Sequence, residues 1–139
     1  MKHYNELTIF TDGGSRGNPG PAAYGFVITD DNKQVIYEEG KTIGIDTNNV
    51  AEYSAIMEAL RWIEQNAKVD KISFFMDSML CAQQLSGKWK IKSENLRSLY
   101  FTIKEIERSL QVPVTYSHVR REYNKDADKL VNLALDGHI

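Results

Sequence analysis

Four acidic residues lie where the sequence predicts the end of a strand or the first turn of a helix: Asp12, Glu52, Asp77 and Asp128. Asp12 follows the apolar run LTIFT (7–11), and Asp77 closes the apolar run KISFFM (71–76) in the same manner. An unpaired carboxylate at the end of a buried strand is costly unless a cation meets it. The acids at these strand ends therefore indicate a site that binds positive charge.

The carboxyl ends of adjacent parallel strands lie along one edge of a sheet, which is the usual ligand crevice of α/β proteins. We therefore expect Asp12 and Asp77 to be neighbours. Converging carboxylates repel one another, and their pKa values rise unless a cation neutralises them. Oxygen ligands without a Cys/His cluster favour Mg²⁺ or Mn²⁺ over zinc. Two such ions about 3.5 to 4 Å apart can drive hydrolysis of a phosphodiester, which predicts a nuclease.

Each acid also has a purely structural interpretation when it is taken alone. Asn49 followed three residues later by Glu52 is a capping-box arrangement. The helix macrodipole favours acids such as Glu52 and Asp128 in a first helical turn. Asp77 can cap a helix that starts at Ser78. These alternatives stay open for each residue by itself, and they weaken when all the acids are expected at one edge of a sheet.

The stretch FTDGGSRGNPGPAAYGF (10–26) is rich in glycine around Asp12, with glycines at positions 13, 14, 17 and 20. This spacing fits neither of the common phosphate-binding glycine motifs, both of which lead from a strand into a helix. Here another strand pattern follows, so a nucleotide-cofactor loop is disfavoured. The glycines and prolines instead indicate a tight connection between two strands, which leaves the acid unexplained.

The positioning elements follow from the change in hydrophobic period along the chain. Strands are predicted at 7–11, 22–29, 34–44, 71–76 and 112–119. Helices are predicted from Val50 onward, with Asn48 and Asn49 as candidate caps, over 78–87, over 93–110 and from about Lys125. The polar turn DDNK (30–33) joins the second and third strands as an antiparallel hairpin. The pattern predicts an α/β fold with a mixed five-stranded sheet, three antiparallel strands followed by parallel ones, and helices on both faces.

Composition limits the setting in which this chemistry takes place. The 139 residues contain no repeat and no linker, so a single domain over 1–139 is expected. No run approaches the roughly 18 apolar residues of a membrane span, and the start resembles no secretory signal. The one cysteine, Cys81, is expected in the core, and a cytoplasmic location is predicted. A net charge of −2 indicates that any nucleic-acid binding depends on local clusters.

Four blocks resemble, in order, the motifs of type 1 ribonuclease H, and together they cover nearly the whole chain. The blocks are DGGSRGNPG (12–20), TNNVAEY (47–53), FMDS (75–78) and NKDADKLVNLA (124–134). The resemblance implies the ribonuclease H fold, with Asp12, Glu52, Asp77 and Asp128 as the catalytic, metal-binding carboxylates. In this hypothesis Asp12 bridges two Mg²⁺ or Mn²⁺ ions and the other acids complete the site.

The resemblance also implies contacts with the substrate at seven further residues: Gly13, Gly14, Ser15, Asn18, Thr47, Asn48 and Asn49. The backbone at Gly13, Gly14 and Ser15, with the asparagines Asn48 and Asn49, is expected to contact the RNA strand in the minor groove. There the 2′-hydroxyls distinguish RNA from DNA. Asn18 and Thr47 match positions at which the family binds a phosphate of the DNA strand, although turn and cap hydrogen bonding is an equal alternative.

Two segments depart from the pattern of many bacterial members. The loop VRREYNKDA (119–127) lacks the histidine that they carry, and HVRREYNKDAD (118–128) looks like a shorter-loop subgroup with archaeal-type and reverse-transcriptase-like members. Arg121 is then the matching basic residue, either contacting the scissile or leaving phosphate or lying solvated on the surface. SGKWKIKSENLR (86–97) has room for only a stub of the usual basic protrusion, either a small hybrid-binding ridge or a charged connector.

The acids predict hydrolysis of a nucleic-acid backbone, and the resemblance implies an endonuclease that cleaves the RNA strand of RNA/DNA hybrids and leaves 5′-phosphate and 3′-hydroxyl ends. We expect the chain to be a monomer that needs no protein partner and does not associate with a membrane. The competing hypotheses are the same chemistry on double-stranded RNA or structured junctions, a hybrid-binding module without turnover, and a structural domain whose acids only cap helices.

Overall fold

The computed structural model describes all residues, 1–139, and consists of one sheet with four α-helices. The elements in chain order are β1 (Lys2–Ser15), β2 (Gly20–Thr29), β3 (Val35–Asp46), α1 (Asn48–Asn66), β4 (Ala67–Met76), α2 (Met79–Leu85), α3 (Glu94–Leu110), β5 (Val114–His118), the 3-10 helix η1 (Arg121–Tyr123) and α4 (Lys125–Leu135). None of the helices combines the length and apolar character that crossing a membrane requires.

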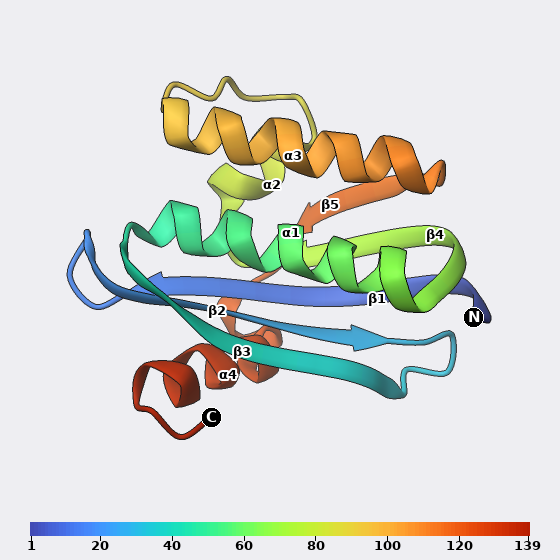
Figure 1. Cartoon of the computed structure of the whole chain (residues 1–139), viewed down its shortest axis with the longest axis horizontal. Coiled ribbons are helices and arrows are strands. Elements are labelled where there is room, and N and C mark those ends of the chain that lie inside the picture. Colours follow the sequence, from blue (N-terminus) through green and yellow to red (C-terminus); the bar gives the residue numbers. More distant parts are fainter.

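The sheet has the strand order β3-β2-β1-β4-β5 (Figure 1). β1, β2 and β3 pair antiparallel, whereas β4 pairs parallel with β1 and β5 pairs parallel with β4. The predicted mixed sheet of three antiparallel strands followed by parallel strands is confirmed. The two parallel connections pass through helices, because a parallel pair needs a long crossover.

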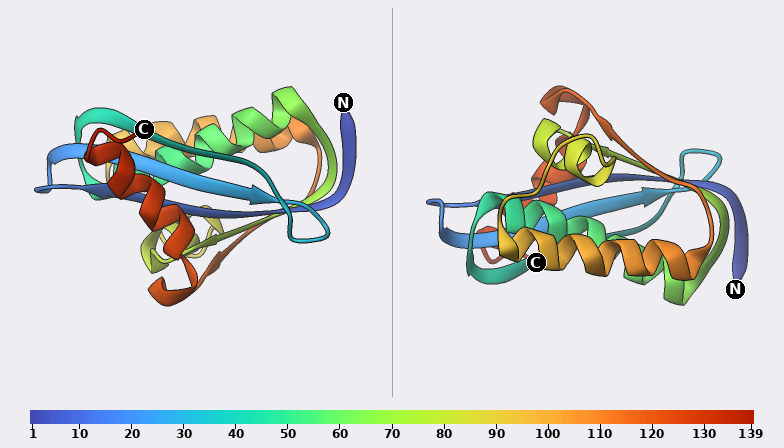
Figure 2. Two further views of the ribbon diagram at one scale, coloured as in Figure 1. Left: turned by 90° about the horizontal axis from the view of Figure 1, so that it is seen from below. Right: turned by 90° about the horizontal axis from the view of Figure 1, so that it is seen from above.

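Helices cover both faces of the sheet, as predicted. α1, α2 and α3 share one face with the main core of 23 buried residues, whereas α4 lies on the opposite face (Figure 2). β2 is the most deeply buried strand because it lies between α1 and α4. Its residues alternate accordingly: Tyr24 and Phe26 face the main core, and the smaller Ala23 packs against α4.

β1 is longer than the sequence predicted and includes Gly13 and Gly14. Asp12 lies inside this strand, because the antiparallel ladder with β2 continues past it to Ser15. Its predicted position at a strand end is therefore wrong for this pairing. The parallel ladder with β4, however, ends at the pair Thr11 and Met76, so Asp12 and Asp77 are the next residues on the two strands. The strands diverge at that point, which opens the sheet edge where both acids lie.

Three helices begin at hydroxyl side chains that accept a hydrogen bond from a backbone N–H in the first turn. Thr47 caps α1, Ser78 caps α2 and Ser93 caps α3. The predicted caps Asn48 and Asn49 are therefore wrong, since both lie within α1. The Asn48 carboxamide oxygen instead accepts a hydrogen bond from the backbone N–H of Ser15, on another element.

Candidate active site

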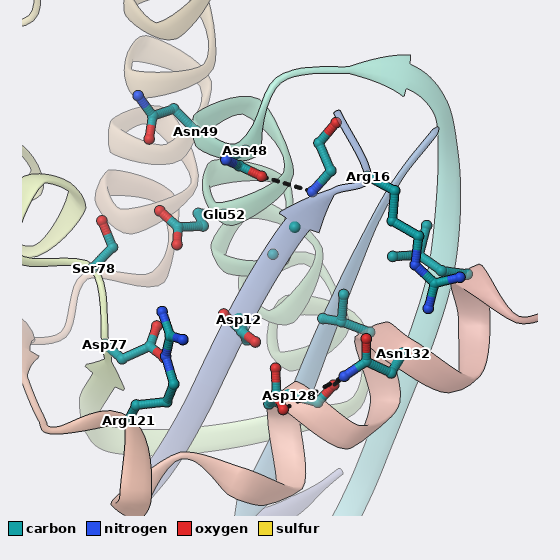
Figure 3. A pocket seen from close by; sticks show the side chains of 15 residues that line it. Asp12, Arg16, Asn48, Asn49, Glu52, Asp77, Ser78, Arg121, Asp128 and Asn132 are labelled. Carbon is teal, nitrogen blue, oxygen red and sulfur yellow. Dashed lines mark hydrogen bonds and ion pairs between the residues drawn. The ribbon is translucent and has the colours of Figure 1, made fainter. Parts of the chain in front are cut away.

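A cleft of about 450 Å³ opens at the edge where β1 and β4 diverge. Ten of the predicted site residues line it: Asp12, Gly13, Gly14, Ser15, Asn48, Asn49, Glu52, Asp77, Arg121 and Asp128. They come from β1, from the N-terminal parts of α1 and α4, from the residue that follows β4 and from η1 (Figure 3). Segments that are far apart in the sequence therefore meet in one polar depression.

Three carboxylates form a tight group in this cleft. Asp12, Glu52 and Asp77 each offer an oxygen, and these oxygens all lie within 4.8 Å of one another. Asp128 lines the same cleft from α4 but lies outside this three-residue group. Figure 3 shows Asp12 between the side chains of Asp77 and Asp128. The expectation that Asp12 and Asp77 are neighbours is confirmed, and the structure brings all four predicted acids into one cleft.

Two glycines beside Asp12 explain how the helices reach it. A Cβ atom on Gly13 would lie 2.3 Å from the carbonyl carbon of Ala51 and from the backbone nitrogen of Glu52. The first turns of α1 thus rest directly on β1 and bring Glu52 beside Asp12. Gly25 is the partner of Asp12 across the ladder with β2, and its Cβ would lie 2.7 Å from the carbonyl oxygen of Ala127 on α4. Close backbone approach of this kind requires glycine.

The crowding of negative charge shows in the pKa values. Burial raises the pKa of Asp12 to about 8, and the charges of Asp77, Glu52 and Asp128 add to the effect. Burial also raises the pKa of Glu52, while hydrogen bonds from Cys81 and Ser78 oppose the shift. A divalent cation would relieve this repulsion. The donor set, carboxylate oxygens without a nearby histidine, fits Mg²⁺ or Mn²⁺.

The capping interpretation fails for two of the acids. Thr47 is the N-cap of α1 and no acid lies in the first turn of that helix, so Glu52 forms no capping box. Ser78 rather than Asp77 caps α2. Asp128 does lie in the first turn of α4, where the helix macrodipole favours it.

Asn18 and Thr47 do not line the cleft and form the turn and cap hydrogen bonds of the alternative interpretation. Thr47 accepts from the backbone N–H of Val50, and Asn18 accepts from the backbone N–H of Asn48 at 3.0 Å. These bonds tie the turn between β1 and β2 to the start of α1. The cleft wall formed by Ser15 and Asn48 is held by this arrangement.

Arg121 is the most exposed of the predicted site residues that carry charge. Its side chain is 88% exposed, and its Nε atom lies 3.7 Å from a carboxylate oxygen of Asp77. The guanidinium group extends beside Asp77 at the cleft (Figure 3). An exposed guanidinium beside a mostly buried acid can turn toward an incoming anion without losing a buried partner.

The sequence interpretation missed several residues at the site. Ser78, Arg16 and Asn132 also line the cleft, and the buried Asn124 donates from Nδ2 to the backbone oxygen of Thr11 at 2.8 Å. Asn124 thereby ties the start of α4 to the residue before Asp12. Its place four residues before Asp128 was the available signal, because an asparagine that precedes a helix is commonly held by hydrogen bonds.

Comparison with known proteins defines the class to which this fold and cleft belong. Residues 10–134 match the protein family described as Reverse transcriptase-like. The crystal structure of RNase H1 from the archaeon Halobacterium salinarum has 38% sequence identity and a TM-score of 0.89, covering 96% of this chain and 99% of that chain. LC11-RNase H1 in complex with RNA/DNA hybrid has 39% identity and a TM-score of 0.90, covering 94% and 97%. The protein is thus a ribonuclease H-like α/β protein.

Within that class the chain belongs to the type 1 ribonuclease H family. The bifunctional protein Rv2228c of Mycobacterium tuberculosis is 40% identical over 134 residues, which are 94% of this chain and 36% of that protein. The chain thus spans about a third of the length of this relative. The similarity to an archaeal protein agrees with the archaeal-type pattern predicted for residues 118–128.

Proposed function

We propose that the chain is a metal-dependent endoribonuclease that hydrolyses the RNA strand of RNA/DNA hybrids and leaves 5′-phosphate and 3′-hydroxyl ends. The observation that carries the proposal is the group of Asp12, Glu52 and Asp77, whose carboxylate oxygens lie within 4.8 Å of one another. Asp128 joins them in the same cleft. The relative LC11-RNase H1, whose structure is in complex with RNA/DNA hybrid, supports this class of substrate.

Two Mg²⁺ or Mn²⁺ ions are proposed for this cleft, held by Asp12, Glu52, Asp77 and Asp128. When bound, such a pair supplies an activated water and stabilises the leaving oxygen of the phosphodiester. The chain's own contribution is to hold the carboxylates at short distances on rigid elements. Because their repulsion is built into the fold through Gly13 and Gly25, the site is prepared for positive charge before any ligand arrives.

The walls of the cleft are proposed to select the substrate. Gly13, Gly14 and Ser15 line the cleft together with Asn48 and Asn49, and the hydrogen bond from the Ser15 backbone N–H to the Asn48 carboxamide oxygen joins the two segments into one wall. Contacts with 2′-hydroxyls at this wall would favour RNA in the cleaved strand. The backbone of β1 and the amide groups of α1 provide the hydrogen-bonding atoms for such contacts.

Three residues near the cleft are proposed to hold phosphates of the two strands. Arg121 would contact the scissile or leaving phosphate, for which its exposed guanidinium beside Asp77 is well placed. Asn18 and Thr47 would seat a phosphate of the DNA strand through the hydrogen-bonded turn and helix start that they form. With a net charge of −2, the chain should bind hybrids with modest affinity that falls steeply with salt.

A cleavage assay across matched duplexes tests this function. RNA/DNA hybrid, double-stranded RNA and double-stranded DNA of one sequence are incubated with Mg²⁺, with Mn²⁺ or with a chelator. We expect metal-dependent cleavage of the RNA strand of the hybrid alone, with products that require phosphatase treatment before their 5′ ends can be labelled. Equal cleavage of double-stranded RNA would contradict the proposed preference for hybrids. Tight hybrid binding without any product would show that the chain is a binding module and not an enzyme.

A further inference from the structure

The only cysteine of the chain contacts a carboxylate of the active-site cleft. The Cys81 thiol donates a hydrogen bond to the Oε2 atom of Glu52, with a distance of 3.1 Å between sulfur and oxygen. Cys81 lies in α2 and is fully buried in the main core, whereas Glu52 lies in α1 and lines the cleft. A core residue thus contacts a cleft carboxylate from the side of the core.

We propose that Cys81 is a positioning residue that fixes the orientation of the Glu52 carboxylate for divalent metal. A glutamate has three side-chain torsions, and the last one is broad, so the carboxylate needs a fixed partner to hold one orientation. The hydrogen bond engages Oε2 and therefore defines the direction in which the second oxygen points. Partners behind metal ligands act in this way, and their loss weakens metal binding.

The local chain makes Cys81 well suited to this task. The same short segment supplies Asp77 to the carboxylate group and Ser78 to the cap of α2, and the Cys81 backbone N–H donates to the Ser78 hydroxyl at 3.2 Å. The position of the thiol is thus coupled to the position of Asp77. The thiol can donate one hydrogen bond, and the Glu52 carboxylate is the acceptor that it contacts.

The alternative is a cysteine that only fills space in the core. That role needs an apolar side chain that fills the space and no donor. Valine is apolar, somewhat larger than cysteine and has no hydrogen-bond donor, whereas serine is somewhat smaller and keeps a donor. The two substitutions therefore separate packing from hydrogen bonding. Leu85→Val provides the matched control, because Leu85 is buried in the same helix and core and does not line the cleft.

Mn²⁺ affinity of the free protein is the first measurement, by calorimetry without nucleic acid. Cys81→Val should weaken Mn²⁺ binding about tenfold, whereas Cys81→Ser should restore it to within about threefold of wild type. Leu85→Val should lower the melting temperature and leave Mn²⁺ affinity unchanged. In cleavage assays Cys81→Val should raise the Mn²⁺ concentration needed for half-maximal rate while the rate at saturating Mn²⁺ stays close to wild type.

The infrared S–H stretching band is an independent measurement, since it arises from Cys81 alone. It should lie at a lower frequency in the folded wild type than in the urea-unfolded chain. Glu52→Gln should move the folded band upward, because a neutral amide oxygen is a weaker acceptor than a carboxylate. A folded band at the unfolded position would overturn the proposal even if Cys81→Val does not fold.

The inference rests on the proposed function, and the two fail in different ways. If the wild type and Cys81→Val bind Mn²⁺ equally well, Cys81 has no positioning role and the metal site stands. If the wild type binds no Mn²⁺ and cleaves no hybrid, the proposed function fails, and the role of Cys81 fails with it.

Discussion

Two helices bring acids to Asp12, and they are held against the sheet in different ways. α1 packs through large apolar side chains such as Ile56 and Leu60, which are fully buried in the main core. The core cluster between α4 and the sheet has only three buried residues, all of them small or medium in size: Ala23 of β2 with Val131 and Ala134 of α4. α4 rests instead where Gly25 and Gly40 leave room for its backbone. Burial of apolar area thus anchors Glu52 much more strongly than Asp128.

This difference divides the site into a fixed part and an adjustable part. Asp12 lies in β1, Glu52 lies in α1 and Asp77 directly follows β4. These three elements share the large core, and the oxygens of the three acids form the tight group. Asp128 lies on the helix with few buried apolar residues, outside that group. Regions with less apolar burial open more easily. We expect the first three acids to define the metal site and Asp128 to complete it.

The largest expected effects come from removing single carboxylates. Asp77→Asn should lower the single-turnover rate of hybrid cleavage on the order of 10³-fold, because loss of a metal ligand costs several kcal/mol of transition-state stabilisation. Asp128→Asn should lower it about tenfold, the size of effect expected when a supporting group is lost. Asp126→Asn is the control, since Asp126 is exposed in the same helical turn and does not line the cleft.

Equal losses for Asp77→Asn and Asp128→Asn would remove the distinction between the fixed and adjustable parts. Undiminished cleavage by Asp77→Asn would contradict the proposed role of the carboxylates altogether.

A pair of neighbouring glycines tests the packing side of the comparison. Gly13→Ala should lower the free energy of unfolding by about 3 kcal/mol, since its Cβ would lie 2.3 Å from the backbone of α1. Gly14→Ala should change it by less than about 1 kcal/mol, because its Cβ would meet only the Val131 side chain at 3.5 Å. Urea unfolding of both variants provides the measurement. If the two variants are equally stable, direct contact between α1 and β1 does not position Glu52.

The smallest expected effect concerns stability without metal. With its pKa raised to about 8, Asp12 holds a proton between about pH 4 and pH 8 that the unfolded chain has already released. The free energy of unfolding of the metal-free protein therefore falls as pH rises through this window. Asp12→Asn should remove that loss and raise the melting temperature near pH 8 by about 5 °C.

Thermal melts at several pH values, with and without Mn²⁺, check this prediction. Mn²⁺ should stabilise the wild type and have little effect on Asp12→Asn, because only a folded, intact site binds it. A lower melting temperature for metal-free Asp12→Asn than for the wild type would support the competing hypothesis, in which the acids have only a structural role.

The fold was predictable because its signals are local. The change from strand to helical period at Val50 and the polar turn at 30–33 fix the element order, and the carboxylates could be paired from their places beside parallel strands. The predicted cap of α1 was wrong because Thr47, Asn48 and Asn49 are all residue types that cap helices well. The choice among them depends on Ser15 of β1, whose backbone N–H donates to the Asn48 side chain.

The roles of the glycines and of the cysteine could not be predicted either, because they depend on contacts with elements far away in the sequence. Gly13 and Gly25 are required by the backbones of helices that begin far along the chain. The contact between Cys81 and Glu52 joins residues of different helices. No local pattern records such distances, so the sequence predicts which acids meet in the cleft better than it predicts which residues hold them in place.

The central claim is that Asp12, Glu52 and Asp77 jointly bind divalent metal, with Asp128 completing the site. Anomalous diffraction from crystals grown with Mn²⁺ and an uncleaved RNA/DNA hybrid tests it most directly. We predict Mn²⁺ peaks in the cleft within coordination distance of these carboxylates, next to a phosphate of the RNA strand. Mn²⁺ bound elsewhere, or a hybrid bound with the acids unliganded, would contradict the account.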